Sequence, residues 1–345
     1  MSQSSKLIRV LVVDDSAFAR KVLREALSQN PALEVVGIAR DGLEALEKIA
    51  ELAPDVVTLD LVMPNLDGLG VLRALPREGG PRVVVVSISD ADSALGIEAL
   101  QNGATDLVQK PTALATDRLY ELSGELVAKV INAAQSKKVT IEPARGPLDL
   151  RPRAAASLGV RLVVIGTSTG GPQALTRLLT AFPRDLPCAV AVALHIPAGY
   201  TEALARRLDE SCAVRVFEAR DGAPIPAGSV AIARGGAHLR VAEEGGVLTA
   251  RVSPHPLTAP FCPSVNVLFE SAAALGPAVL GVVLTGMGDD GLLGSRALRD
   301  AGGRILTEAE SSAVVYGMPR SVREAGLSAG EARIEDMAEV ILRNI

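Results

Sequence analysis

The chain is poor in aromatic side chains: its 345 residues include no Trp, three Tyr and five Phe. Surfaces that bind single-stranded nucleic acid depend on such side chains for base stacking. Basic charge is not in excess either, since 35 Lys and Arg face 40 Asp and Glu. The resulting net charge of −5 offers no field to attract phosphate backbones or anionic lipid. We therefore expect no nucleic-acid partner and no membrane-surface partner.

Cysteine and long apolar runs are also scarce. Cys188, Cys212 and Cys262 are widely spaced and form no Cys-x-x-Cys pair, which excludes a disulfide framework and a zinc knuckle. No stretch approaches 18 uninterrupted apolar residues, and the first residues show no leader-like apolar segment. These absences predict a cytoplasmic protein without membrane insertion.

What is present predicts an α/β fold in two doubly wound domains. Short β-branched runs alternate with amphipathic stretches, as parallel sheets covered by helices require. A Gly-rich section at about 228–252 is expected to be antiparallel. A Pro-rich basic stretch at 136–157 predicts a linker between domains 1–135 and 158–345. The runs are 10–13, 35–38, 56–59, 83–86 and 106–108, then 161–165, 189–194, 214–217, 279–285 and 304–306.

Polar residues follow the predicted strands of the first domain. Asp14, Asp15 and Asp60 would meet at the carboxyl edge of the sheet, together with Ser87 and Lys110. Crowded carboxylates suit Mg²⁺, and one of them can accept a phosphoryl group that the Lys and Ser side chains then contact. The alternative for each residue alone is a helix cap, a turn or a solvated side chain.

The first domain resembles response-regulator receiver domains. The resemblance rests on the runs 12–16 and 59–64, on Asp67-Gly68 and on Lys110-Pro111, and it covers residues 6–132. It implies a flavodoxin-like receiver with Asp60 as phosphoacceptor, a histidine kinase as phosphodonor and Mg²⁺ as cofactor.

The second domain carries a possible nucleophile. Gly166-x-Ser168-x-Gly170 has nucleophile-elbow spacing after a buried strand, with small neighbours that leave the Ser hydroxyl clear. The alternatives are that Ser168 caps a helix or that the loop holds a phosphate. Among three histidines, His195 ends the next strand and is the candidate base, whereas His238 and His255 are expected to be solvated in loops.

A carboxylate is needed to orient the base, and either Asp289 or Asp290 could serve because both follow the strand at 279–285. The same segment, Gly286–Gly291, also matches a dinucleotide fingerprint with Glu308 or Glu310 as the ribose-binding acid. Two aspartates there would repel a pyrophosphate, which favours the catalytic interpretation.

The second domain resembles the catalytic domain of chemotaxis protein-glutamate methylesterases, a Rossmann-like hydrolytic domain. The motifs lie at 165–171, 195–200, 263–265, 284–291 and 316–319, within a match over about 160–345. The resemblance implies Ser168 as nucleophile, His195 as base, Asp290 as orienting acid, and the amides of Thr169 and Met287 as oxyanion donors.

Both resemblances together imply a phosphorylation-regulated hydrolase without a cofactor in its hydrolytic domain. Its substrates would be glutamate γ-methyl esters, and glutamines for deamidation, on the cytoplasmic part of methyl-accepting chemoreceptors, with a chemotaxis-type histidine kinase as phosphodonor. Two alternatives remain from sequence: an NAD-type oxidoreductase that uses Gly286–Gly291, and a non-catalytic receiver-linked adaptor.

Overall fold

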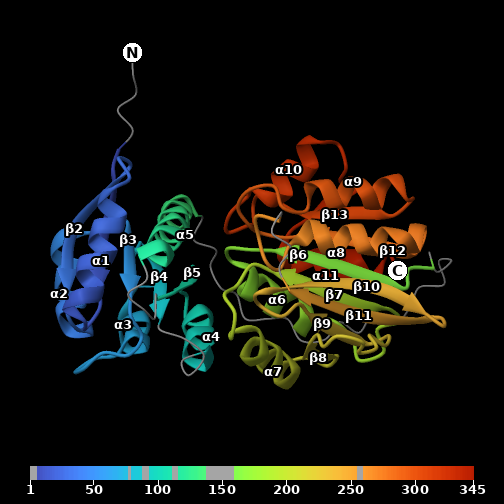
Figure 1. Ribbon diagram of the computed structural model, residues 1–345, viewed down its shortest axis with the longest axis horizontal. Coiled ribbons are helices and arrows are strands. Elements are labelled where there is room, and N and C mark those ends of the chain that lie inside the picture. The colour runs from blue at the N-terminus through green and yellow to red at the C-terminus, as the bar shows by residue number, and fades with distance from the viewer. Residues whose placement is uncertain (1–5, 77–78, 88–92, 111–115, 137–158, 255–258) are drawn as a thin grey trace, which may run out of the picture. The chain divides into compact units, whose positions relative to one another are not determined.

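The computed structural model describes residues 6–345 except 77–78, 88–92, 111–115, 137–158 and 255–258. The chain divides into two compact units, residues 1–140 and 141–345 (Figure 1). The predicted linker lies outside the described residues, apart from Ser136, and so does His255. No helix among the described residues is both long enough and apolar enough to cross a bilayer.

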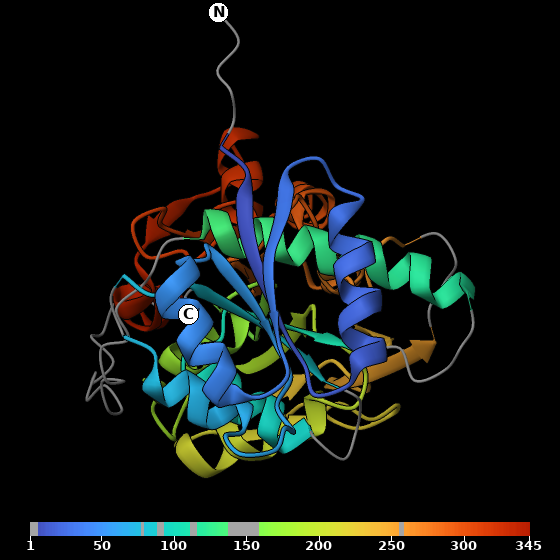
Figure 2. The same ribbon diagram turned by 90° about the vertical axis from the view of Figure 1, so that its left-hand side faces the viewer.

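The first unit is a five-stranded parallel sheet with the order β2-β1-β3-β4-β5. In Figure 2 its strands run between α1, in dark blue, and α2, in lighter blue. Its elements are β1 (Ile8–Val13), α1 (Ala17–Ser28), β2 (Leu33–Ala39), α2 (Gly42–Leu52), β3 (Val56–Leu59), α3 (Gly68–Ala74), β4 (Arg82–Ser87), α4 (Ser93–Gln101), β5 (Asp106–Gln109) and α5 (Thr116–Gln135).

Aliphatic side chains hold this unit together, as the composition predicts. Alternate residues of the central strands, such as Val10 and Val84, pack against Leu23 of α1 and Leu126 of α5 in one buried cluster. At about 1.5–3 kcal/mol for each fully buried aliphatic side chain, this burial fixes the strands and therefore the positions of their ends.

The second unit contains a seven-stranded parallel sheet with the order β14-β13-β12-β6-β7-β9-β8. Its elements are β6 (Leu162–Thr167), α6 (Gly171–Thr180), β7 (Ala189–Leu194), α7 (Thr201–Ser211), β8 (Arg215–Glu218), β9 (Ser229–Ile232), β10 (Ala237–Glu244), β11 (Val247–Pro254), α8 (Val265–Ala272), η2 (Ala273–Ala278), β12 (Val279–Val283), α9 (Leu292–Asp300), β13 (Arg304–Glu308), α10 (Met318–Glu324), β14 (Gly330–Ala332) and α11 (Ile334–Leu342).

The prediction of an antiparallel section is confirmed only for the hairpin β10-β11. The beginning of the same section is wrong: β9 pairs in parallel with both β7 and β8 inside the main sheet. All four β9 residues are buried, and burial on both faces is what a strand inside a parallel sheet requires. The short edge strand β14 was not predicted.

The direction in which successive strands are added to the second sheet reverses at its middle strand, β6. From β6 the chain moves to β7 on one side, and it later returns to the other side as β12. In open parallel sheets, ligands bind beyond the carboxyl ends of the strands at such a switch point. The first sheet has the same feature between β1 and β3.

Candidate functional site

The three residues of the predicted triad follow three neighbouring strands. Ser168 comes directly after β6, His195 directly after β7, and Asp290 lies seven residues beyond β12. The amide of His195 donates to the carbonyl oxygen of Thr167 at 3.1 Å, and the amide of Ser168 donates to that of Thr285 at 3.0 Å. Backbone hydrogen bonds thus continue past the ends of β6 and β7 and fix the positions of Ser168 and His195.

His195 and Asp290 are in direct contact. Nε2 of His195 lies 2.7 Å from Oδ2 of Asp290, and their side chains are 10% and 2% exposed. A carboxylate only accepts hydrogen bonds, so Nε2 carries the proton and Nδ1 keeps the lone pair. This assignment is the reverse of that in chymotrypsin-like proteases, but it leaves one ring nitrogen as a base. Asp290, not Asp289, is therefore the partner of His195.

Asp290 is held by the first residues of α8. Its Oδ1 accepts from the amide of Asn266 at 2.9 Å and from the hydroxyl of Ser264 at 3.0 Å, and its Oδ2 accepts from the amide of Val265 at 2.7 Å. Burial alone would raise the pKa of Asp290, but these backbone bonds and the bond from His195 outweigh it and lower that pKa. The partial positive charge of a helix N-terminus favours the same ionised state.

Ser168 stands on the expected tight turn. Two residues further on, the φ of +79° at Gly170 lets α6 begin at Gly171, and a Cβ at Gly170 would lie 2.6 Å from Val314. Ser168 itself is partly exposed. Among the described contacts its hydroxyl makes no hydrogen bond with His195. Hydrogen bonds of this kind are often long without substrate and tighten when it binds.

The segment after β12 reaches Ser168 because Gly286 has no side chain. A Cβ at Gly286 would lie 2.9 Å from the Cβ of Ser168 and 2.3 Å from the sulfur of Met318. Its amide donates to Val315, and its carbonyl oxygen accepts from the amides of Gly317 and Met318 at 3.0 and 2.8 Å. These bonds fix the peptide that leads into Met287 beside the nucleophile candidate. Thr169 is buried, and Met287 is 43% exposed.

Glu308 is a fully buried carboxyl behind these loops. Its Oε2 accepts from the amide of Thr285 at 2.7 Å, and its Oε1 accepts from the hydroxyl of Ser312 at 2.9 Å. The sequence gives Glu308 a role only in the dinucleotide alternative, as a possible ribose-binding acid. Because Glu308 is buried and each of its carboxylate oxygens already accepts a hydrogen bond, neither oxygen is placed to bind a ribose from solvent. Burial raises the pKa of Glu308 to about 7.

Glu308→Gln is expected to flatten the pH dependence of stability. Because folding raises the pKa of Glu308 above the usual 4.5, the contribution of its protonated carboxyl to stability is fully present below about pH 4.5 and is lost as pH rises through about 7. The full span corresponds to about 3 kcal/mol. Urea unfolding at pH 5 and pH 8 should show the variant gaining on the wild type as pH rises. The exposed Glu324→Gln is the control, and an unchanged pH dependence in Glu308→Gln would contradict the assignment.

The expectation for His238 is wrong. This residue is completely buried on β10, and its Nδ1 accepts from the amide of Ser264 at 3.2 Å. It therefore anchors the segment that holds Asp290. The motif at 263–265 belongs to the family resemblance but predicts no contact with Asp290, although Ser264 one residue before an apolar helical run is a recognisable N-cap signal.

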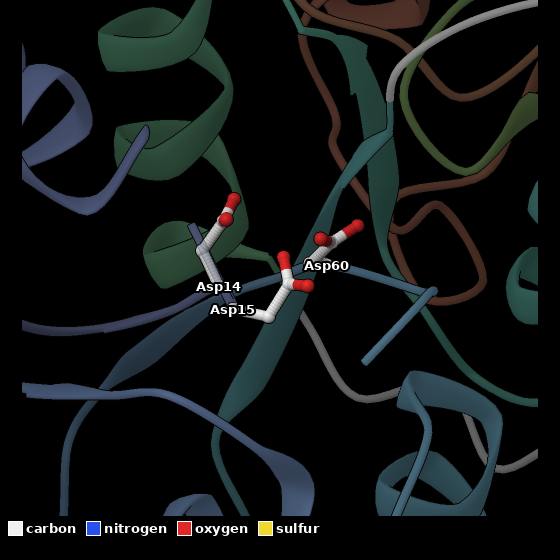
Figure 3. A group of neighbouring side chains, drawn as sticks. All are labelled: Asp14, Asp15 and Asp60. Atoms are coloured by element: carbon white, nitrogen blue, oxygen red, sulfur yellow. The ribbon is translucent and has the colours of Figure 1, made fainter. Parts of the chain in front are cut away.

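The first unit gathers its acids as predicted (Figure 3). Asp14, Asp15 and Asp60 each offer a carboxylate oxygen, and these oxygens all lie within 4.8 Å of one another. Nζ of Lys110 lies 2.7 Å from Oδ2 of Asp14 and 2.6 Å from Oδ2 of Asp60. Ser87, at the end of β4, is 1% exposed, and its hydroxyl has no hydrogen-bond partner within the described part of the chain.

Charge in this cluster is only partly balanced. Burial and the neighbouring Asp14 carboxylate raise the pKa of Asp60, although Lys110 opposes the shift. Burial disfavours the charged form of Lys110, but its bonds to Asp14 and Asp60 outweigh this and raise its pKa. Asp15 is exposed. Three neighbouring carboxylates, two of which contact the ammonium of Lys110, fit a hard divalent cation, because such cations prefer oxygen ligands.

Comparisons with known proteins agree with both units. The model of the CheB methylesterase family matches residues 163–341, and that of the response regulator receiver domain matches residues 10–121. A protein-glutamate methylesterase/protein-glutamine glutaminase 5 of Myxococcus xanthus is 60% identical over 98% of each chain. The chain belongs to the CheB methylesterase family. It is an enzyme of that family with a receiver domain in front, which implies a part in chemotaxis adaptation.

Two further relatives of this methylesterase family cover different lengths. A protein-glutamate methylesterase/protein-glutamine glutaminase of Geobacillus kaustophilus is 44% identical over 99% of each chain. The CheB methylesterase catalytic domain of Thermotoga maritima is 33% identical, with a TM-score of 0.53, and covers 54% of this chain and 99% of its own. The predicted fold class and enzyme class are confirmed. Family membership speaks against both the oxidoreductase and the non-catalytic adaptor.

Proposed function

We propose that this methylesterase hydrolyses glutamate γ-methyl esters on the cytoplasmic part of methyl-accepting chemoreceptors, by a Ser168-His195-Asp290 triad. The 2.7 Å contact between His195 and Asp290, beside the turn that carries Ser168, is the observation that supports this most strongly. The products are methanol and the glutamate carboxylate. A glutamine amide passes through the same tetrahedral geometry, so deamidation of receptor glutamines is the second activity.

Each group has one task in the reaction. Nδ1 of His195 takes the hydroxyl proton while the Ser168 oxygen attacks the ester carbonyl, and the imidazolium then gives this proton to departing methanol. Asp290 stabilises the imidazolium. The amides of Thr169 and Met287 donate to the oxyanion. Water then clears the acyl-enzyme with His195 again as the base.

The first domain, 1–135, is proposed to control the second, 158–345. Asp14, Asp15 and Asp60 would hold Mg²⁺, which neutralises charge on the incoming phosphoryl group. A chemotaxis-type histidine kinase would phosphorylate Asp60, and Ser87 and Lys110 would contact the phosphoryl oxygens. Phosphorylation then relieves inhibition of the hydrolytic domain. A tenfold activation requires a shift of only about 1.4 kcal/mol between two states.

Asp60→Asn should leave basal methanol release unchanged and abolish its activation by acetyl phosphate, because an amide cannot form the acyl phosphate. The assay compares initial rates on methylated receptor membranes with and without acetyl phosphate and Mg²⁺. Glu51→Gln, an exposed carboxylate on α2, is the control and should be activated like the wild type. Activation that survives in Asp60→Asn would show that Asp60 is not the switch.

A further inference from the structure

An aromatic ring lies flat against the candidate base. The ring of Phe261 stacks on the imidazole of His195 with centroids 4.4 Å apart and an angle of 12° between the planes. The chain has only eight Phe and Tyr residues, and one of them is stacked on the candidate base. The expected triad does not account for it.

Exposure of Phe261 argues against a purely structural role. The residue is 39% exposed, although burying a Phe fully would stabilise the fold by about 1.5–3 kcal/mol. The His195 side chain beneath it is only 10% exposed. The Phe261 ring thus covers one face of the imidazole, while the remaining surface of the Phe261 ring is open to solvent.

The segment that carries Phe261 also builds the rest of the acid-base pair. Three residues further along, Ser264 and the first amides of α8 bind the carboxylate of Asp290. Two hydrogen bonds fix this segment to neighbouring parts of the unit. The amide of Ser264 donates to the buried His238, and the carbonyl oxygen of Cys262 accepts from the amide of Gly236 at 3.4 Å. One anchored stretch therefore contacts both His195 and Asp290.

We propose that Phe261 is a positioning residue for ester hydrolysis, whose aromatic face holds the plane of the His195 ring and stabilises the imidazolium that forms during proton transfer. Contact with Asp290 through Nε2 fixes one edge of the imidazole, and stacking prevents rotation about the bond that joins the ring to Cβ. The face of an aromatic ring attracts a cation. This inference rests on the proposed role of His195 as the base.

Two substitutions separate the aromatic face from apolar bulk. Phe261→Leu keeps a large apolar side chain without a π-face, and Phe261→Tyr keeps the ring. We expect Phe261→Leu to lower kcat by roughly three- to thirtyfold with KM within about twofold of wild type, because the stacking acts mainly once charge develops. Phe261→Tyr should retain most of kcat. Thermal unfolding of both variants checks that the fold is unchanged.

The histidine ring protons give a readout that does not depend on activity. The chain has three histidines, so their signals can be resolved by NMR and that of His195 identified with His195→Gln. A ring stacked at 4.4 Å shields these protons, so the His195 signal should move downfield in Phe261→Leu and stay in place in Phe261→Tyr.

Three results would overturn the inference: a wild-type kcat in Phe261→Leu, an unmoved His195 signal, or equal losses in Phe261→Leu and Phe261→Tyr. Failure of the proposed function looks different. In that case wild-type protein releases no methanol from methylated receptors, while the NMR comparison still decides whether Phe261 orders the His195 ring.

Discussion

Asp290→Asn will lower kcat by roughly 10³- to 10⁴-fold and destabilise the second unit. Each carboxylate oxygen accepts one backbone amide, that of Asn266 on Oδ1 and that of Val265 on Oδ2. In either orientation the amide nitrogen of the new side chain therefore faces a buried N–H donor. Leaving such a donor unsatisfied costs about 1–3 kcal/mol.

The loss of activity has a separate cause. With the amide nitrogen at the Oδ2 position, Nε2 of His195 must accept, so Nδ1 carries the proton and cannot take one from Ser168. Methanol release measures kcat, and urea unfolding measures the change in stability. Asp289→Asn is the matched control, because Asp289 is adjacent but exposed. A kcat in Asp290→Asn within tenfold of wild type would contradict the role of Asp290.

The positions of the three proposed triad residues could be predicted because they depend on strand ends. Ser168 and His195 are the first residues after neighbouring parallel strands, and the buried, β-branched character of those strands is visible in the sequence. The same holds for Asp14 and Asp60 in the first unit. Once the order of strands is right, residues at their carboxyl ends converge without further information.

The surroundings of the triad could not be predicted in this way. Asp290 is held by Ser264, Val265 and Asn266, which lie about 25 residues earlier on a helix whose direction the strand pattern does not determine. The stacking of Phe261 on His195 spans a still longer separation. For the same reason strand ends alone do not decide between Asp289 and Asp290, and only the family resemblance implies Asp290. Contacts with α8 bury Asp290, whereas Asp289 is exposed.

Ser168→Ala should lower turnover by roughly 10⁴- to 10⁶-fold without unfolding the protein. The oxygen that would be acylated is removed, whereas the amide of Ser168 still donates to Thr285 and the turn keeps its backbone. Ser168 is partly exposed, and its hydroxyl is not needed to cap α6, which begins after Gly170. Thermal unfolding should therefore be close to that of the wild type.

Methanol release from methylated receptor membranes, measured side by side for the wild type, Ser168→Ala and Ser211→Ala, tests the account most directly. Ser211 is an exposed serine at the end of α7 and serves as the matched control. We predict release by the wild type and by Ser211→Ala, and none above background by Ser168→Ala. Release by Ser168→Ala at a rate near that of the wild type would contradict the assignment of Ser168 as the nucleophile.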